Sequence, residues 1–378
     1  MRRQWLFAPF LLLVWLVFVA CASTREATPA PAGPTQTARA AWEEEWGTVL
    51  AAAKQEGKVT VLGPPGEEIR EALTKPFQKR YGVSVEYMGL RGPEMASRIR
   101  TERGAGQYLW DIWITGTTDM FETGKAMKAL DPIEPALLLP EVKEGKNWRG
   151  GKLEFADKDR LILAMTPYVM SPLMVNPNLA KPEEIKAYRD ILASRWKGKI
   201  ILHDPRVAGP GEAAFTFFYQ HKDLGPDFIR ALAAEKPAIS RDWRQQIEWI
   251  ATGKYAILVG GNTSVATPLM KEGLTVRIVD SRGLKEGGYV TSGGGTLALF
   301  NKAPHPNAAK VYINWLLNKE GQEGFSRAIS YVSRRLDVPT DFVDAWMVPI
   351  EGYWAHDSED AIASARQVVA FLNEVFPE

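Results

Sequence analysis

The sequence is poor in cysteine and histidine, which build disulfides and metal centres, and it has no excess of charge of one sign. Its 378 residues include one cysteine, Cys21, so no disulfide can form within the chain. The four histidines (His203, His221, His305, His356) lie far apart, without the spacing of a metal site. The 46 basic and 45 acidic residues nearly balance, so the chain lacks the positive field that attracts nucleic acid. We therefore expect no metal and no nucleic-acid partner.

Catalytic and nucleotide-binding motifs are also scarce. The sequence has no P-loop and no G-x-S-x-G elbow. Residues 209–214 mimic a G-x-G-x-x-A fingerprint, but Pro210 lacks the N–H that would face a phosphate. The acidic strand end expected about 20 residues later is missing as well. We therefore expect a protein without a cofactor that is not an enzyme.

The N-terminus combines a basic pair, Arg2 and Arg3, with an apolar run over 5–20. That run is shorter than the ~20 residues that a membrane-spanning helix needs and is typical of a secretory signal. Residues 18–21, Phe-Val-Ala-Cys, resemble a lipobox, although Phe18 stands where Leu is usual. The segment 1–20 is thus predicted to be a lipoprotein signal peptide, with Cys21 as the lipidated residue. An uncleaved anchor helix and a secreted protein with an incidental cysteine are the alternatives.

Residues 21–40 begin with Cys21. The residues after it, 22–40, have no aliphatic side chain larger than alanine. Such a stretch cannot build a core, so a flexible tether is predicted. The folded part then begins near Ala41 and is long enough for two lobes.

Strand and helix patterns alternate along most of the folded part, with a glycine-containing loop after each strand. Strand patterns at 59–63, 83–89 and 108–116 are each followed by a helix pattern. The same order returns at 198–205 and 254–262. This alternation predicts mainly parallel sheets with helices on both faces.

Two long extended segments suggest where the chain crosses between lobes. One covers residues 160–177, between the two sets of elements, and the other covers 287–302. We predict an α/β fold of two lobes with two hinge crossings and a cleft between the lobes. The predicted boundaries are 41–165 for the first part of lobe one, 166–287 for lobe two, and 288–378 for the return to lobe one and the C-terminal helices.

Several stretches, "GKVTVLG", "RGPEMASRIRTERGAGQYLWDI", "YRDILASRWKGKIILHDPR" and "SRRLDVP" among them, resemble the solute-binding proteins of bacterial ABC importers. The similarity spans about 42–340 and is most specific over 293–322. It is greatest to the group that binds ferric iron and related small ligands, including thiamine. The resemblance implies a type 2 periplasmic-binding fold, whose lobes close over one ligand. It also implies an ABC permease with its ATPase as partners; we expect a monomer.

One departure from that group concerns iron. Ferric-binding members place two adjacent tyrosines after an Asn-Ser or Asn-Thr pair, since phenolate suits Fe³⁺. Here Asn262-Thr263 is followed by Ser264 and Val265, and no Tyr-Tyr pair occurs anywhere. We therefore expect a small polar or anionic solute, with ferric iron on atypical ligands as an alternative.

The candidate ligand contacts come from loops that follow strands, because ligands of open α/β sheets bind beyond the carboxyl ends of strands. Arg91 and Arg206 are placed to approach one anionic group from opposite lobes, and a guanidinium donates two parallel N–H bonds. In the alternative, each pairs with a nearby acid, Glu94 or Asp204. The other predicted contacts are Thr117, Thr118, Tyr168, Asn262, Thr263 and Ser264.

Two further residues of the same loops and strands carry open alternatives. Trp113, like Tyr168, would stack on or wall off an organic ligand, or belong to the core of its strand. Arg334, with its neighbour Arg335 in "SRRLDVP", would contact the ligand or brace the hinge. The sequence thus predicts an extracytoplasmic, lipid-anchored solute receptor of an ABC importer. An enzyme or a sensor subunit on the same fold is the rival interpretation.

Overall fold

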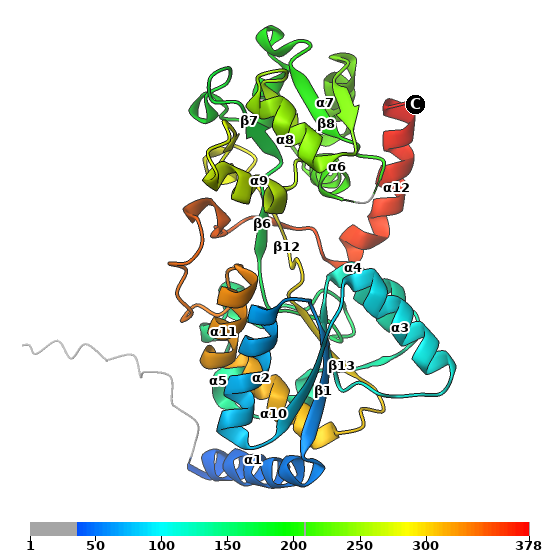
Figure 1. Ribbon diagram of the computed structural model, residues 1–378, viewed down its shortest axis with the longest axis vertical. Helices are drawn as coiled ribbons and strands as arrows, with labels where there is room; N and C mark the ends of the chain where they lie inside the picture. Colours follow the sequence, from blue (N-terminus) through cyan, green and yellow to red (C-terminus); the bar gives the residue numbers. More distant parts are fainter. Residues whose placement is uncertain (1–35, 208, 378) are drawn as a thin grey trace, which may run out of the picture. The chain divides into compact units, whose positions relative to one another are not determined.

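The computed structural model describes residues 36–207 and 209–377 (Figure 1). The chain divides into two units, residues 1–41 and 42–378. The predicted signal peptide and Cys21 lie outside the described residues. The tether prediction differs from the structure at its end, because helix α1 (Gln36–Glu56) already includes residues 36–40. That stretch, QTARA, consists largely of good helix formers and continues directly into the helix.

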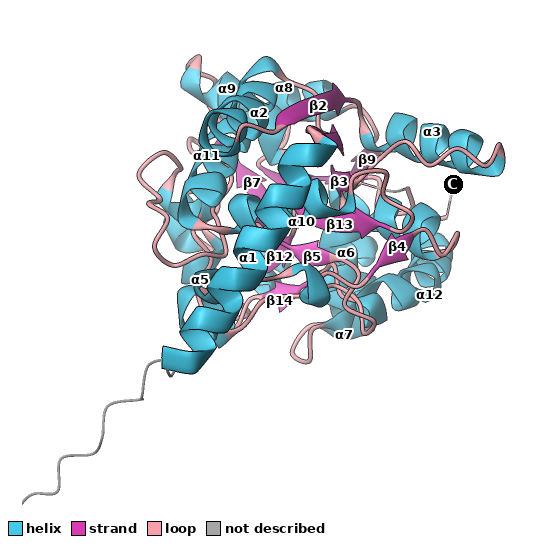
Figure 2. Ribbon diagram, turned by 90° about the horizontal axis from the view of Figure 1, so that it is seen from below, coloured by secondary structure: helices cyan, strands magenta, loops and turns pink. Residues whose placement is uncertain are grey.

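A six-stranded sheet forms the centre of lobe one, with the order β2-β1-β3-β13-β4 and with β5 paired to β13. β1 is parallel to β2 and β3, whereas β13 runs antiparallel to β3. β2, β3, β13, β4 and β5 of this sheet are labelled in Figure 2. The predicted parallel arrangement therefore holds for the first strands, and the strands from the crossings are antiparallel. The strands are β1 (Lys58–Gly63), β2 (Ser84–Gly89), β3 (Ile112–Thr115), β4 (Leu130–Asp131), β5 (Leu163–Ala164) and β13 (Thr296–Phe300).

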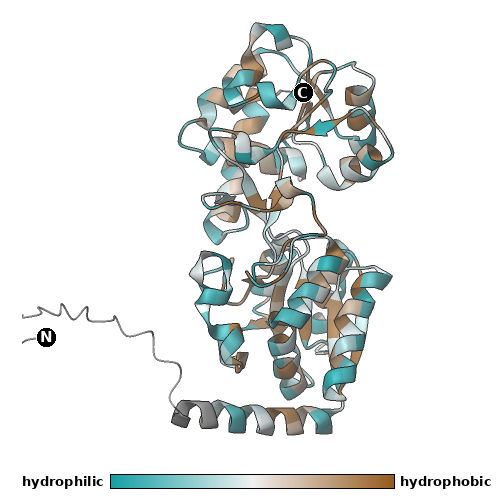
Figure 3. Ribbon diagram, turned by 90° about the vertical axis from the view of Figure 1, so that its left-hand side faces the viewer, coloured by the Kyte–Doolittle hydropathy of each residue, from teal (hydrophilic) through white to brown (hydrophobic). Residues whose placement is uncertain are grey.

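Aromatic side chains fill the space between this sheet and its helices. Phe77 is fully buried, with its ring centroid 5.0 Å from that of Tyr312 and 5.3 Å from that of Trp315. The strands carry the apolar residues, and polar residues gather on the outer helix faces (Figure 3). The helices of lobe one are α2 (Glu67–Tyr81), α3 (Gly92–Gly104), α4 (Thr117–Asp119) with the π-helix Met120–Lys125, α5 (Pro140–Lys143), α10 (Pro306–Leu317) and α11 (Lys319–Ile329).

Lobe two has a five-stranded sheet with the order β11-β7-β10-β8-β9. β8 is parallel to β9 and β10, and β7 is antiparallel to β10. Its strands are β7 (Leu173–Val175), β8 (Ile200–His203), β9 (Ala238–Ser240), β10 (Ile257–Val259) and β11 (Arg277–Ile278). Its helices are α6 (Pro210–Gln220), α7 (Gly225–Ala234), α8 (Trp243–Ala251) and α9 (Thr263–Lys271).

A third, small sheet joins the two crossings. β6 (Tyr168–Met170) pairs antiparallel with β12 (Tyr289–Thr291), as expected for two hinge strands. β14 (Trp354–Ala355) adds a third strand, parallel to β12. The C-terminal segment therefore takes part in the hinge, which the sequence did not indicate.

The last helix, α12 (Glu359–Val375), corrects the assignment of residues 288–378 to lobe one. Val368, Leu372 and Phe376 are buried within the core of lobe two, and the Phe376 ring lies 5.5 Å from that of Phe215 on α6. The apolar stripe of α12 fits this core, whereas its periodicity alone does not say which lobe it covers. Within residues 36–207 and 209–377, no helix is both long and apolar enough to cross a bilayer.

Candidate ligand-binding site

The predicted contacts of lobe one lie where β2 and β3 end. Arg91 immediately precedes α3, and Thr117 begins α4 directly after β3. The side chain of Thr117 is buried, and that of Thr118 is exposed. These positions follow from the strand–loop–helix order, which brings the carboxyl ends of parallel strands to one edge.

In lobe two, three predicted contacts lie at the start of α9. The Asn262 side chain caps the helix and accepts hydrogen bonds from the N–H groups of Ser264, at 2.9 Å, and Val265, at 3.3 Å. This capping explains the helix boundary. The preceding Gly260 has φ 74°, and a Cβ there would meet Gly211 at 2.6 Å. The α9 loop therefore packs closely against the start of α6.

Tyr168 links the hinge with both lobes. Its hydroxyl is hydrogen-bonded to Thr263 Oγ1 at 2.7 Å and to Ser264 Oγ at 3.2 Å. Its ring stacks on Tyr331, which follows α11 of lobe one, with centroids 4.2 Å apart. Three of the predicted contacts are thus brought together, and Tyr331 is a neighbour that the sequence analysis missed.

Thr117 meets a carboxylate of its own chain. Its hydroxyl donates to Asp357 Oδ2 at 3.0 Å, and the N–H of Ser292 donates to the same oxygen. Burial opposes the charge on Asp357, but hydrogen bonds from His356, Ser292 and Thr117 outweigh it and lower the pKa of Asp357. The C-terminal segment therefore places a negative charge beside a predicted ligand contact. Nothing in the local pattern around residue 357 indicates this role.

The two predicted arginines are paired with the acids that the alternative named. Arg91 donates to Glu94 Oε1, and its side chain is 78% exposed. Arg206 donates to both carboxylate oxygens of Asp204, at 2.8 and 3.0 Å, and to the carbonyl of Phe376 at 2.8 Å. Arg206 thereby ties the loop after β8 to the end of α12.

Trp113 belongs to the core, as its alternative stated. It is fully buried on β3 and stacks on Phe300 of β13, with centroids 5.6 Å apart. Within the described residues, no three His, Cys, Asp or Glu side chains form a group that could hold a metal ion. His203 pairs with Gln246 at 3.0 Å, and burial lowers the pKa of its ring.

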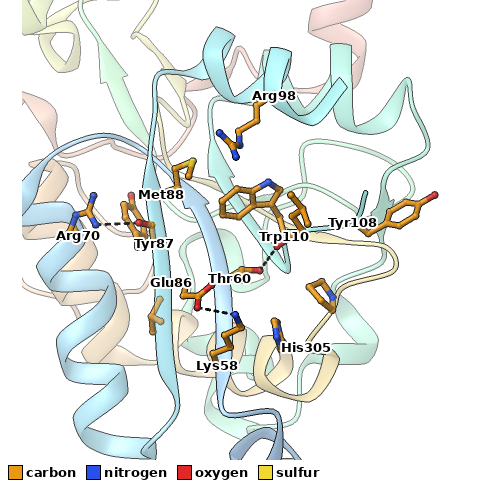
Figure 4. Close-up of a pocket in the computed structure, with 13 residues that line it drawn as sticks. Lys58, Thr60, Arg70, Glu86, Tyr87, Met88, Arg98, Tyr108, Trp110 and His305 are labelled. Carbon is orange, nitrogen blue, oxygen red and sulfur yellow. Dashed lines mark hydrogen bonds and ion pairs between the residues drawn. The ribbon is translucent and has the colours of Figure 1, made fainter. Parts of the chain in front are cut away.

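A cavity of about 690 Å³ in lobe one contains none of the predicted contacts (Figure 4). It is lined by β1, β2 and the loop before β3. Its charged groups already have partners: Lys58 is paired with Glu86 at 2.9 Å, Arg98 with Glu102 at 2.6 Å, and Arg70 donates to the carbonyl of Tyr87 at 3.3 Å. His305 is likewise bonded to a carboxylate beneath the surface. The candidate solute contacts therefore remain those predicted at the strand ends.

Several solved structures of bacterial binding proteins are similar to this chain in fold. The ferric iron-binding protein A of Mannheimia haemolytica, in an open conformation, has a TM-score of 0.66 and 16% identity, covering 84% of this chain and 98% of that one. A Trichodesmium protein (IdiA, FutA) in complex with iron and citrate has a TM-score of 0.63 and 17% identity, covering 85% and 100%. AfuA of Actinobacillus pleuropneumoniae, with bound fructose-6-phosphate, has a TM-score of 0.55 and 17% identity, covering 84% and 98%. These likenesses confirm the predicted two-lobed periplasmic-binding fold.

Similarity in sequence identifies the family of this chain. An uncharacterized protein of Haemophilus influenzae is 21% identical over 280 residues, which are 73% of this chain and 77% of that protein. The model of the bacterial extracellular solute-binding protein family matches residues 72–349, which include both lobes and the hinge strands β6 and β12. The chain therefore belongs to the family of bacterial extracellular solute-binding proteins.

Proposed function

We propose that this solute-binding protein serves an ABC importer. It captures a small polar or anionic solute between its lobes, closes about the hinge and delivers the solute to a membrane permease. The observation that carries the proposal is the arrangement around Tyr168, where one hinge residue contacts the start of α9 and stacks on Tyr331. A ligand seated there would touch both lobes and the hinge, which is what a closing receptor requires.

The neutral part of the proposed site consists of hydroxyl and amide groups. Asn262, Thr263 and Ser264 lie at a helix N-terminus, whose partial positive charge favours an anionic ligand atom while the N–H groups of Ser264 and Val265 donate to Asn262. Arg91 adds a charge that can turn to the ligand, because an exposed ion pair with Glu94 contributes little to stability. Arg206 would contribute from lobe two while keeping Asp204 as its partner.

Native mass spectrometry of freshly purified protein tests the proposal. We expect a co-purifying small molecule in one-to-one stoichiometry that is lost after partial unfolding and dialysis. Binding of the identified solute to the stripped protein should then be weakened in Thr263→Ala and in Arg91→Gln. A solute that binds both folded variants as tightly as the wild type would place the site elsewhere.

Ferric iron is the second candidate ligand. The structural neighbours from Mannheimia and Trichodesmium are an iron-binding protein and a complex with iron. The stacked phenols of Tyr168 and Tyr331 are the donors that would favour iron here. Elemental analysis separates the candidates, since a ferric–phenolate site gives stoichiometric iron and visible absorption. Colourless protein without iron supports the organic solute.

The family consists of extracellular binding proteins, and we propose in addition that this member is a monomer without enzymatic activity, held at the membrane by a lipid on Cys21. The balanced charge and the bonding of two histidines to structural partners support a binding role: His203 is bonded to Gln246, and His305 to Asp111. Size-exclusion chromatography with light scattering tests the oligomeric state.

A further inference from the structure

A second cavity, of about 510 Å³, lies beside the hinge strands. Three separate segments line it: residues 146–154, the Arg334 loop, and residues 349–353 of the C-terminal segment. Pro167 and Val290, next to and within the hinge strands, complete the lining.

This cavity faces away from Tyr168. Tyr168 is paired with Thr291 across β6 and β12, and Val169 is paired with Val290. Residues paired across a ladder share a face, and neighbours along a strand point to opposite faces. Val290 therefore lies on the opposite face of the hinge sheet from Tyr168, so the cavity is distinct from the proposed solute site.

Arg334 is a cation without a counterion in this cavity. Within the described residues its side chain makes no hydrogen bond and no ion pair, and its Nε is buried without an acceptor. Burial lowers the pKa of Arg334; Glu154 and Asp357 counteract this without approaching to ion-pair distance. The adjacent Arg335 is the contrast, since it is bonded to Asp337 at 2.9 Å and to the carbonyl of Leu317 at 3.1 Å.

Arg149 is a second partly buried guanidinium in the lining. Its Nε donates to the carbonyl of Ser333 at 3.3 Å, and it forms no ion pair with any residue of 36–207 or 209–377. Burial lowers its pKa too. The remaining charged groups of the lining are Lys146, which is paired with Glu144 at 2.8 Å, together with Glu154 and Glu351.

We propose that this cavity binds a small oxyanion, of the phosphate or carboxylate type, through the guanidinium groups of Arg334 and Arg149. A buried charge is costly unless it is paired, and a guanidinium matches an oxyanion through two parallel N–H bonds. A bound oxyanion would also approach residues 349–353, which lead into β14 and α12. It would thereby hold the C-terminal segment against the back of the hinge.

The test measures the melting temperature of the full folded part in sodium phosphate, sodium sulfate or sodium citrate against sodium chloride of equal ionic strength. An oxyanion at ten times its Kd should raise the melting temperature by about 2–4 °C. Similar increases in melting temperature with phosphate and sulfate, and a smaller increase with citrate, indicate a tetrahedral oxyanion. A larger increase with citrate indicates a carboxylate.

Variants locate the effect. Arg334→Gln and Arg149→Gln should each abolish most of the increase, and Arg334→Lys should retain part of it. Arg244→Gln is the matched control, because Arg244 is an exposed arginine of α8 paired with Glu248 at 3.2 Å. If Arg334→Gln does not fold, the increase measured in Arg149→Gln decides whether the oxyanion binds in this cavity. An increase that persists in the Arg149 and Arg334 variants, or that disappears in Arg91→Gln instead, overturns the proposal; in the latter case the anion binds at the proposed solute site.

Discussion

The hydroxyl of Tyr168 is shared between two side chains at the start of α9, while the ring keeps a separate contact with Tyr331. The two parts of this side chain can therefore be tested independently. The hydroxyl contacts lobe two through α9, and the ring contacts lobe one through Tyr331.

Tyr168→Phe removes the hydroxyl and leaves the stacked ring. We expect a loss of about 0.5–1.5 kcal/mol in the free energy of unfolding, because Thr263 loses a buried partner. The affinity for the solute should fall by about 2- to 10-fold. Urea denaturation and calorimetry measure the two effects. Tyr255→Phe, whose ring packs on Trp249 of α8, is the control and should change neither; an equal loss in both variants would contradict the role of Tyr168.

The ionised carboxylate of Asp204 contributes to the stability of lobe two. Its side chain is 2% exposed and accepts from Arg206 at 2.8 Å and Arg241 at 2.9 Å. Burial alone would raise its pKa, but the bonds from Arg206 and Arg241 prevail and lower it to about 2. A lowered pKa in the folded state stabilises the fold above the ordinary pKa of 3.8, and this contribution is lost as the pH falls toward 2.

Asp204→Asn should therefore destabilise the protein near pH 7 by about 1–3 kcal/mol. The difference in unfolding free energy between wild type and variant should narrow as the pH falls from about 4 to about 2. Denaturant titrations at a series of pH values measure it. A difference that stays constant down to pH 2 would show that Asp204 contributes through packing and not through charge.

Among the elements, α12 is one whose helix could be predicted from the local pattern, but not the core against which its buried face packs. Its apolar stripe predicts a helix with one buried face, and the helix is observed. Its partner is the core of lobe two, reached only after the chain passes the hinge as β14. Ion pairs at its start, Lys125 with Glu359 at 2.7 Å and Lys158 with Asp360 at 2.9 Å, remain in lobe one.

Leu372→Ala tests this packing. Leu372 is fully buried, and its loss should cost about 2–5 kcal/mol of unfolding free energy because a cavity forms in the core of lobe two. Asn373→Ala, at the exposed neighbouring position, should change it by no more than about 0.5 kcal/mol. Thermal denaturation followed by circular dichroism compares the two; similar values would mean that α12 is loosely attached.

Features that depend on residues close together in the sequence could be predicted from it, whereas contacts between residues far apart in the sequence could not. β1, β2, β3, β8 and β10 occur where local patterns predict them, because burial and strand periodicity act over a few residues. The loops after these strands were predictable for the same reason. The pairing of Thr117 with Asp357 joins residues 240 positions apart, and the stacking of Tyr168 on Tyr331 joins distant segments too. Neither leaves a local trace in the sequence.

At the scale of the whole molecule, the hydrophobic core can be followed along the part of the chain that the structure describes. Within residues 36–207 and 209–377 it begins with Trp46 and Val49, and Trp46 meets Tyr81 of α2 with centroids 6.0 Å apart. The remainder of the core lies between these residues and Phe376. A solute receptor of this kind needs only to remain near its permease, which a lipid and a tether would achieve.

The predicted lipid anchor at Cys21 can be tested independently of the folded part. Metabolic labelling with a fatty acid should mark the wild type and not Cys21→Ala, since no other cysteine is present to accept the lipid. Several acyl chains hold a protein firmly, at about 0.8 kcal/mol per buried CH₂, so the variant should move to the soluble fraction. Deletion of residues 1–35 should leave the melting temperature and solute affinity unchanged, because the core of the described residues begins at Trp46 and is complete without residues before it. A wild type that is membrane-bound but unlabelled, and that behaves like Cys21→Ala, would show that the apolar run over 5–20 is an uncleaved anchor.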